Sequence, residues 1–379
     1  MRTPRFVAVT ALLSLLGVVS TGLVGCGDGN TPAVTTPTVP TAAKNIYVVQ
    51  ASGSTTILQE SVLVFPASTT GTATPASTLM LPSNFVAFAF ATGPQGQIYL
   101  SGIQNPQTAT YGTILEYPAG SSGSATPSVM LNGSATGTGT FNRSYNIAVN
   151  SANTLVVSSQ DGSVETFASG FNASSAPTQY LTWGKTNFFD GGDSIAIDTA
   201  GDIFYGDWGN GQGTKSVIDV FTAGATGAAA PVRQITGTST TSLYYDGQPF
   251  VVADGAGDVY VAYYNQANDP NSPPAGATLA NNEPTGIIEF AAGATGNATP
   301  LRRISGALTK IVEPTGMAVD AISNLYYMDS NGTFFTNANV PSLFEVFPSS
   351  STGDVAPATS FTSTSSTYFD DGEGGLAVY

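Results

Sequence analysis

The sequence predicts an all-β fold in which six four-stranded antiparallel sheets form one closed ring. Three observations predict it. Four short apolar patterns recur in a fixed order along the chain, turn-forming residues separate them, and the last copy lacks a strand that the start of the chain supplies. Charged residues make up only 9% of the 379 residues and 43 are glycine, a composition that favours short strands and tight turns over helices.

The first pattern predicts the first strand of each sheet and occurs six times. Its copies are FVAFAF (Phe85–Phe90), YNIAVN (Tyr145–Asn150), DSIAID (Asp193–Asp198), PFVVAD (Pro249–Asp254), TGMAVD (Thr315–Asp320) and GGLAVY (Gly374–Tyr379). A second pattern follows the first five copies, at Gln97–Ser101, Thr154–Ser158, Asp202–Gly206, Asp258–Ala262 and Asn324–Met328. Alternating apolar runs bounded by turn residues indicate paired antiparallel strands.

The third and fourth patterns complete each unit. The third ends on an aromatic residue, at Phe65, Tyr117, Phe167, Phe221, Phe290 and Phe347. Its copies lie 50 to 69 residues apart (167 − 117 and 290 − 221). The fourth follows a Gly/Thr-rich turn and a proline, at Pro75, Pro127, Pro177, Pro231, Pro300 and Pro357. A single sheet cannot bury both of its faces, whereas sheets stacked around an axis can.

The end of the chain predicts how the ring closes. No second pattern follows GGLAVY, but KNIYVVQ at Lys44–Gln50 supplies one at the start of the repeats. Six complete sheets result only if the last strand joins a sheet whose other three strands come from residues 45–81. The alternative is an open solenoid, which would leave the last strand as an unpaired apolar edge.

The N-terminus predicts export and lipid attachment. Arg2 and Arg5 precede an apolar run over Phe6–Val19, which is too short for a stable membrane span. The stretch Leu23–Cys26, LVGC, resembles a bacterial lipobox, in which the cysteine is lipidated and becomes the first mature residue. The alternative is an ordinary signal peptide with a chance cysteine. The predicted organisation is a signal peptide at 1–25, lipidated Cys26 with a Thr/Pro-rich tether at 26–43, and the ring at 44–379.

The residue inventory excludes several kinds of chemistry. The chain has no histidine, and Cys26 is its only cysteine. A Ser-His-Asp triad, a Cys-His pair and a His-ligated metal site are therefore excluded, and a lipidated Cys26 leaves no thiol for a disulfide. Without the two arginines of the signal, the net charge is 8 − 25 = −17, so no basic footprint for nucleic acid is present.

Two stretches carry a resemblance to a known family. Val217–Gly237 and Ile287–Asp329 resemble NHL-type β-propeller repeats of exported bacterial proteins, which are related in fold to gluconolactonase-like propellers. The resemblance implies a six-bladed β-propeller over about 335 residues. It also implies that the loops entering first strands, and those joining second to third strands, line a central funnel on an upper face. It identifies an architecture rather than an activity.

Aromatic and acidic residues gather in three of these upper-face loops, FFDGGD (Phe188–Asp193), YYDGQP (Tyr244–Pro249) and YFDDGE (Tyr368–Glu373). Aromatic faces beside carboxylates can hold a sugar or a cationic ligand. The ligand-binding candidates are Trp183, Phe188, Phe189, Asp190, Asp193, Asp207, Trp208, Tyr244, Tyr245 and Asp246. The alternative is that the aromatic rings pack between blades while Asp-Gly shapes the turns.

Other acidic and glycine-rich motifs predict turns. Asp198, Asp254 and Asp320 end first strands and precede turn residues, so their carboxylates are expected to accept hydrogen bonds from nearby backbone amides. The AGATG stretches at Ala223–Gly227 and Ala292–Gly296 lie between strands, with no helix or lysine after them. They predict hairpin loops rather than phosphate-binding loops.

These observations predict a lipoprotein of the cell envelope whose propeller is a ligand- or protein-binding scaffold, without a cofactor. Its expected partners are the membrane, through Cys26, and a peptide, glycan or envelope protein; we expect a monomer that binds no nucleic acid. If the cell has two membranes, the outer one is expected, because Gly27 rather than an aspartate follows Cys26.

The alternative function is a calcium-dependent hydrolase of ester or lactone bonds, with carboxylates in the funnel. Carboxylate and amide oxygens suit Ca²⁺, which takes six to eight oxygen ligands. The metal candidates are Asp193, Asp246, Glu313, Asp371 and Glu373. Carboxylates converging from three or more blades would favour this enzyme, whereas a funnel lined by Thr, Ser and aromatic side chains would favour binding.

Overall fold

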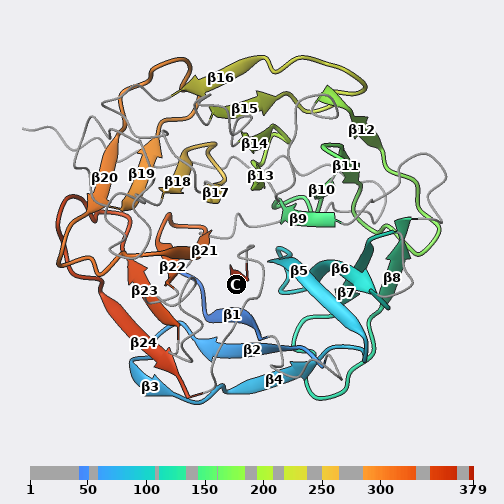
Figure 1. Cartoon of the computed structure of the whole chain (residues 1–379), viewed down its shortest axis with the longest axis horizontal. Coiled ribbons are helices and arrows are strands. Elements are labelled where there is room, and N and C mark those ends of the chain that lie inside the picture. The colour runs from blue at the N-terminus through green and yellow to red at the C-terminus, as the bar shows by residue number, and fades with distance from the viewer. Residues whose placement is uncertain are drawn as a thin grey trace, which may run out of the picture. The chain divides into compact units, whose positions relative to one another are not determined.

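Twenty-five strands in the described part of the chain assemble into six sheets arranged around an axis (Figure 1). The computed structural model describes residues 42–50, 59–106, 111–133, 144–159, 161–183, 194–207, 217–236, 250–263, 285–329, 342–364 and 375–379. All of them belong to one unit, residues 40–379. The predicted signal peptide, Cys26 and most of the tether lie outside the described residues. The described residues contain no helix long and apolar enough to cross a membrane.

Each sheet is one blade, and its four strands are ordered from the axis outward, with the first strand innermost. Blade 1 holds β25 (Leu376–Val378), β1 (Asn45–Gln50), β2 (Ser61–Pro66) and β4 (Ser77–Met80); blade 2 holds β5 (Phe85–Thr92), β6 (Ile98–Gln104), β7 (Thr113–Tyr117) and β8 (Val129–Asn132). Blade 3 holds β9 (Ser144–Val149), β10 (Leu155–Ser159), β11 (Val164–Phe167) and β12 (Gln179–Leu181); blade 4 holds β13 (Ile195–Ile197), β14 (Ile203–Asp207), β15 (Val217–Phe221) and β16 (Arg233–Thr236). Blade 5 holds β17 (Phe250–Ala253), β18 (Val259–Tyr263), β19 (Gly286–Phe290) and β20 (Arg302–Ser305); blade 6 holds β21 (Pro314–Val319), β22 (Leu325–Asp329), β23 (Leu343–Phe347) and β24 (Thr359–Ser363).

The two ends of the repeat region share blade 1, as the strand count predicts. β25 pairs antiparallel with β1, and Ile46 lies opposite Val378 while Val48 lies opposite Leu376. The carbonyl of Tyr379 accepts hydrogen bonds from the amides of Lys44 and Asn45, each at 2.8 Å. The ring is therefore closed, and the chain is a six-bladed β-propeller.

One sheet has a strand that the sequence patterns do not predict. β3 (Gly71–Ala73) lies in the turn between β2 and β4 of blade 1, yet it pairs in parallel with β24 of blade 6. The expected purely antiparallel four-stranded blade is thus extended by a fifth, parallel strand in blade 6. This pairing joins blades 6 and 1 at their outer edge, whereas β25 and β1 close the ring at the inner side of blade 1.

Apolar residues on both faces of each blade build the core. In blade 1, Tyr47, Val49 and Val62 pack against blade 2. Alternate residues of the same strands, among them Val48 and Phe65, pack against blade 6. Because successive side chains of a strand point to opposite faces, a continuous apolar run such as VLVF serves two seams between blades at once.

Aspartates shape the turns after the first strands, as predicted. Oδ1 of Asp254 accepts hydrogen bonds from the amides of Ala256 at 2.9 Å and Asp258 at 3.1 Å. Oδ1 of Asp320, in the next blade, accepts equivalent hydrogen bonds from the amides of Ile322 and Asn324. Asp198 accepts one such bond from Asp202 at 2.9 Å. These carboxylates therefore stabilise the turns that follow the first strands.

The glycine turns between third and fourth strands join neighbouring blades. In blade 5, the amide of Gly296 donates to the carbonyl of Gln234 in β16 of blade 4 at 2.7 Å, and its carbonyl accepts from the amide of Thr236 at 2.8 Å. We call this parallel contact an outer bridge. The other outer bridges in the described residues join Leu79 to Gly123, Leu181 to Gly227, Ile304 to Gly353, and β24 to β3.

Replacing Gly296 by alanine is expected to destabilise the propeller by about 1–2 kcal/mol. Gly296 has φ +58, a left-handed conformation that costs a residue with a Cβ atom, although no atom lies within 4 Å of the position of that Cβ. Urea unfolding measures the change, with exposed Thr299→Ala in the same turn as the control. Equal stability of Gly296→Ala and the wild type would show that the conformation carries no cost.

Candidate functional site

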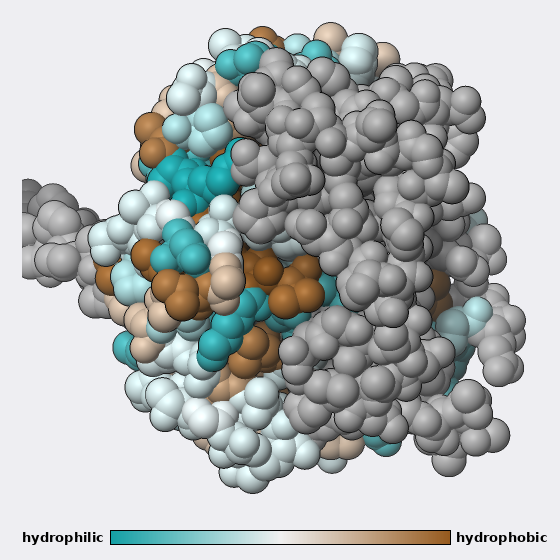
Figure 2. Space-filling model, turned by 60° about the vertical axis from the view of Figure 1, so that its left-hand side comes forward, coloured by the Kyte–Doolittle hydropathy of each residue, from teal (hydrophilic) through white to brown (hydrophobic). Residues whose placement is uncertain are grey.

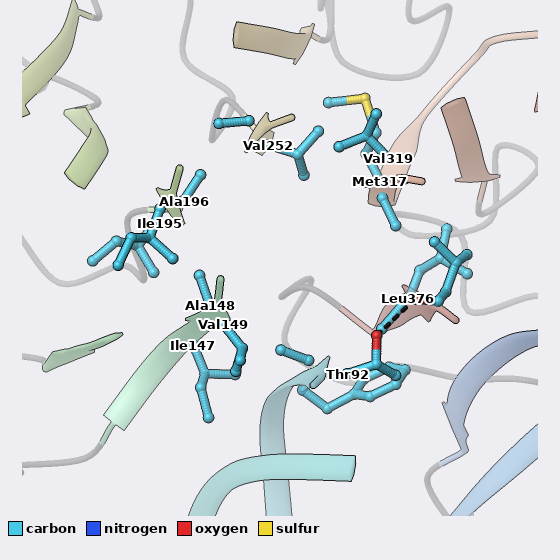
Figure 3. Close-up of a pocket in the computed structure, with 17 residues that line it drawn as sticks. Thr92, Ile147, Ala148, Val149, Ile195, Ala196, Val252, Met317, Val319 and Leu376 are labelled. Carbon is cyan, nitrogen blue, oxygen red and sulfur yellow. Dashed lines mark hydrogen bonds between the residues drawn. The ribbon is translucent and has the colours of Figure 1, made fainter. Parts of the chain in front are cut away.

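The inner strands of all six blades surround a cavity of about 200 Å³ on the propeller axis (Figure 3). Its walls are almost wholly aliphatic: Phe90, Ala91, Thr92, Ile147, Ala148, Val149, Ile195, Ala196, Ile197, Val252, Ala253, Met317, Ala318, Val319, Leu376, Ala377 and Val378. The hydroxyl of Thr92 is turned to the carbonyl of Val378, to which it donates a hydrogen bond of 2.7 Å. The described wall therefore presents no carboxylate and no free hydroxyl donor to the axis.

The strand registers explain why small apolar side chains line this wall. The same position of each inner strand pairs with equivalent second-strand residues, and it is alanine in five blades and valine in the sixth: Ala91, Ala148, Ala196, Val252, Ala318 and Ala377. Small side chains let six inner strands approach the axis together. The loops predicted to line the funnel above this wall lie mostly outside the described residues, so the composition of the funnel stays a prediction.

The upper face carries the connections into first strands and from second to third strands. Most of these connections lie outside the described residues, including those that hold Phe188, Phe189, Asp190, Asp193, Trp208, Tyr244, Tyr245, Asp246, Asp371 and Glu373. The structure therefore describes only Trp183, Asp207 and Glu313 of the predicted site residues. It places Trp183 and Asp207 together, and Glu313 in a different seam.

Trp183 and Asp207 both lie near Asp219, at the seam between blades 3 and 4. The half-buried ring of Trp183 packs against the apolar side chains of this seam. Its indole nitrogen donates a hydrogen bond to Asp219 of β15, and Asp207 lies close enough to Asp219 to repel it. Asp219 is 2% exposed and also accepts a 2.7 Å hydrogen bond from Nε2 of Gln234. Burial raises the pKa of Asp219, and the charge of Asp207 raises it further.

This arrangement supports the view that Trp183 packs between blades. An indole N–H held by a buried carboxylate fixes the ring, and the remaining exposed part of the ring is available to a ligand. Asp219 was not among the predicted residues. The signal for it was an acid inside an otherwise apolar third strand, IDVF.

Glu313 lies in the seam between blades 5 and 6, where three acids are buried. It is 6% exposed, while Asp329 at the end of β22 and Glu345 in β23 are each 1% exposed. Oδ2 of Asp329 accepts hydrogen bonds from the amides of Val312 at 2.7 Å and Glu313 at 2.9 Å, and from the hydroxyl of Tyr327 at 2.9 Å. These three donors satisfy the buried Oδ2 of Asp329.

Glu345 has a different environment from Asp329. Neither of its carboxylate oxygens has a hydrogen-bond partner in the part of the chain that the structure describes. Burial raises the pKa of Glu345 to about 8, and the charge of Asp329 adds to that effect, while Lys310 opposes it. A neutral, protonated Glu345 is thus the form that fits this seam near neutral pH.

The two acid-bearing seams repeat one another. The registers place Asp207 and Asp219 of blade 4 at the same positions as Asp329 and Glu345 of blade 6. In the described residues, no group of three acids is arranged to hold a metal ion. The described acids of these two seams therefore face neighbouring blades.

The surface beside the seam between blades 5 and 6 is mixed in character. Figure 2 shows hydrophobic residues scattered among hydrophilic ones on this side. Leu301, Leu308 and Val312 are each at least half exposed. Single exposed aliphatic residues are common on soluble proteins and do not by themselves mark a site.

Comparisons with known proteins bear on the fold. No family model matches the sequence, and no curated protein matches it. Among solved structures, a protein of unknown function from Bacteroides caccae is similar, with a TM-score of 0.52 and 9% identity; the match covers 89% of this chain and 98% of that chain. At that identity the likeness concerns the arrangement of strands alone.

Proposed function

We propose that this propeller is a binding scaffold of the bacterial cell envelope, exported and held to the membrane by a lipid on Cys26. The half-buried ring of Trp183 supports the proposal most directly: it packs at the seam between blades 3 and 4, and its indole nitrogen donates a hydrogen bond to Asp219. The exposed part of this ring can contact a ligand. The loops in which the sequence places the other aromatic and acidic residues are the proposed surface for recognition.

The ligand class follows from the residue types of the upper-face loops. Aromatic rings next to carboxylates and amides suit a glycan or a cationic peptide. The sequence places such residues in three loops, at 188–193, 244–249 and 368–373. Such residues on three different blades favour a macromolecular partner over a small enclosed substrate.

Binding and location are tested separately. A glycan array and a panel of envelope peptides are probed with the wild type and with Trp183→Ala and Trp208→Ala; at least tenfold weaker binding by the variants is expected. The Cys26→Ser substitution is expected to move the protein from the membrane fraction to the soluble exported fraction, as measured by cell fractionation. The control Thr21→Ser, outside the lipobox, is expected to leave the protein in the membrane fraction.

Two results would count against the proposal. Binding that survives both tryptophan substitutions would place the ligand elsewhere. Calcium that remains with the protein after dialysis, together with ester or lactone hydrolysis that is lost with it, would favour the hydrolase.

A further inference from the structure

Five of the six seams between blades are joined at the outer wall by an outer bridge, and one is not. In those five, the turn before the fourth strand contains Ser or Thr followed by glycine: Gly71, Gly123, Gly227, Gly296 and Gly353. Each glycine lies four residues before the proline of its fourth strand and has a positive φ between +58 and +72. The seam between blades 2 and 3 is the exception among the described residues.

The sequence of blade 3 explains the exception. Its turn reads SGFNASSAP, with Asn172 and Ala173 where the other blades have Ser or Thr and glycine. Ala173 does not adopt the positive φ of those glycines, because a Cβ atom makes that conformation costly. The side chain of Asn172 instead accepts a hydrogen bond of 2.9 Å from the amide of Ser174, which closes a different local turn.

A phenylalanine occupies the space at this seam. Phe171 stands where the other blades carry Thr, Ser or Ala, and it is 7% exposed. Its ring centroid lies 6.1 Å from that of Tyr99 in blade 2 and 5.9 Å from that of Phe167 in blade 3. Aromatic packing therefore holds this seam, and no backbone bridge crosses it among the described residues.

The edge without a bridge belongs to β8. In blade 1 the amide of Met80 and the carbonyl of Thr78 bind Gly123 of the next blade. Leu131 of β8 has the same register as Leu79, so the amide of Asn132 and the carbonyl of Met130 are the equivalent groups. Neither has a backbone partner in the neighbouring blade among the described residues. β8 also lacks the charges and prolines that usually protect an exposed edge.

We propose that this edge of β8 is a docking site for an extended Ser/Thr-Gly segment of a partner protein. The segment adds in parallel to β8, as the chain's own Thr-Gly turns add to β12, β16 and β20. The edge occupies the position that takes part in an outer bridge at the other seams. Those bridges therefore predict the geometry and the parallel orientation of the docked segment. Main-chain hydrogen bonds supply the affinity, as in other strand-addition complexes, and the small contact predicts weak, transient binding.

The site is separate from the upper-face patch, because it lies on the outer wall. It gives the proposed scaffold a second contact of a different chemical kind. Failure of strand addition at β8 would leave the upper-face proposal standing, and the reverse also holds.

The probe is a labelled peptide with the chain's own sequence AAGATGNATP, residues 291–300. Fluorescence polarisation is expected to show saturable binding of this peptide to the wild-type propeller. A control peptide in which Ala replaces the glycine before Asn is expected to bind with at least tenfold lower affinity. The matched protein variant carries Phe171→Ala, Asn172→Thr and Ala173→Gly. These changes give blade 3 the turn residues of the bridged blades, so that its own turn is expected to form an outer bridge with β8. It is expected to lose peptide binding and to slow hydrogen exchange at the Asn132 amide.

Each alternative result overturns the proposal. No saturable binding to a folded wild-type protein would show that the edge does not accept a strand. Equal binding to the triple variant, or equal binding of both peptides, would show that the peptide attaches elsewhere or without the bridge geometry.

Discussion

Ending the chain at Gly375 is expected to remove most of the stability of the propeller. The truncation deletes β25, whose Leu376 and Ala377 are 4% and 5% exposed, and it leaves the inner edge of β1 unpaired. Loss of one buried leucine side chain already costs about 2–5 kcal/mol, and typical domains are stable by only about 5–15 kcal/mol. Urea unfolding followed by circular dichroism is expected to show a loss of at least about 5 kcal/mol or no cooperative transition.

Deletion of Tyr379 alone is the control for this truncation. That variant keeps the pairing of Ile46 with Val378 and of Val48 with Leu376. It loses the carbonyl that accepts from Lys44 and Asn45, so an intermediate loss of about 1–3 kcal/mol is expected. Wild-type stability of the chain ending at Gly375 would contradict ring closure through β25.

Replacing Glu345 by glutamine is expected to stabilise the propeller in mildly alkaline solution. The pKa of Glu345 is raised from 4.5 to about 8 in the folded protein, so folding binds a proton. The stabilising contribution of the protonated form is fully present below about pH 4.5, declines as the pH rises, and is lost above about pH 8. Glutamine has nearly the same shape and does not titrate in this range.

The expected difference is on the order of a few kcal/mol at pH 8.5 and close to zero at pH 4.5. Thermal unfolding at both pH values measures it. Glu116→Gln is the comparison, because the pKa of Glu116 is also raised by burial but the side chain is only partly buried. A stability gap between Glu345→Gln and wild type that is the same at both pH values would rule out the raised pKa as its cause.

The strands and the closure of the ring could be predicted because both rest on short-range patterns. Alternation in runs such as VLVF and NLYYM marks strands buried on both faces, and the missing partner of GGLAVY identifies the shared blade. The carboxylates of Asp254 and Asp320 could be assigned to turns for the same reason, since the accepted amides lie two and four residues away.

The contacts between blades could not be predicted, because they join residues far apart in the chain. The turn glycines were expected only to shape hairpins, yet Gly296 also bridges to a strand about 60 residues earlier. The burial of Asp219 and Glu345 was missed because an acid within an apolar strand has the same sequence pattern whether it faces solvent or a neighbouring blade. Trp183 was predicted as a ligand contact, and its hydrogen bond to Asp219 shows that it also packs in a seam.

The pairing of the terminal strands can be measured directly with a disulfide. Ile46→Cys and Val378→Cys, with Cys26→Ser to remove the only other cysteine, place two thiols at facing positions of β1 and β25, at a separation that a disulfide can span. Mass spectrometry of the oxidised, unreduced monomer is predicted to find the peptide containing residue 46 joined to the peptide containing residue 378. Free thiols in the folded monomer, or a bond found only between two molecules, would contradict the closed ring.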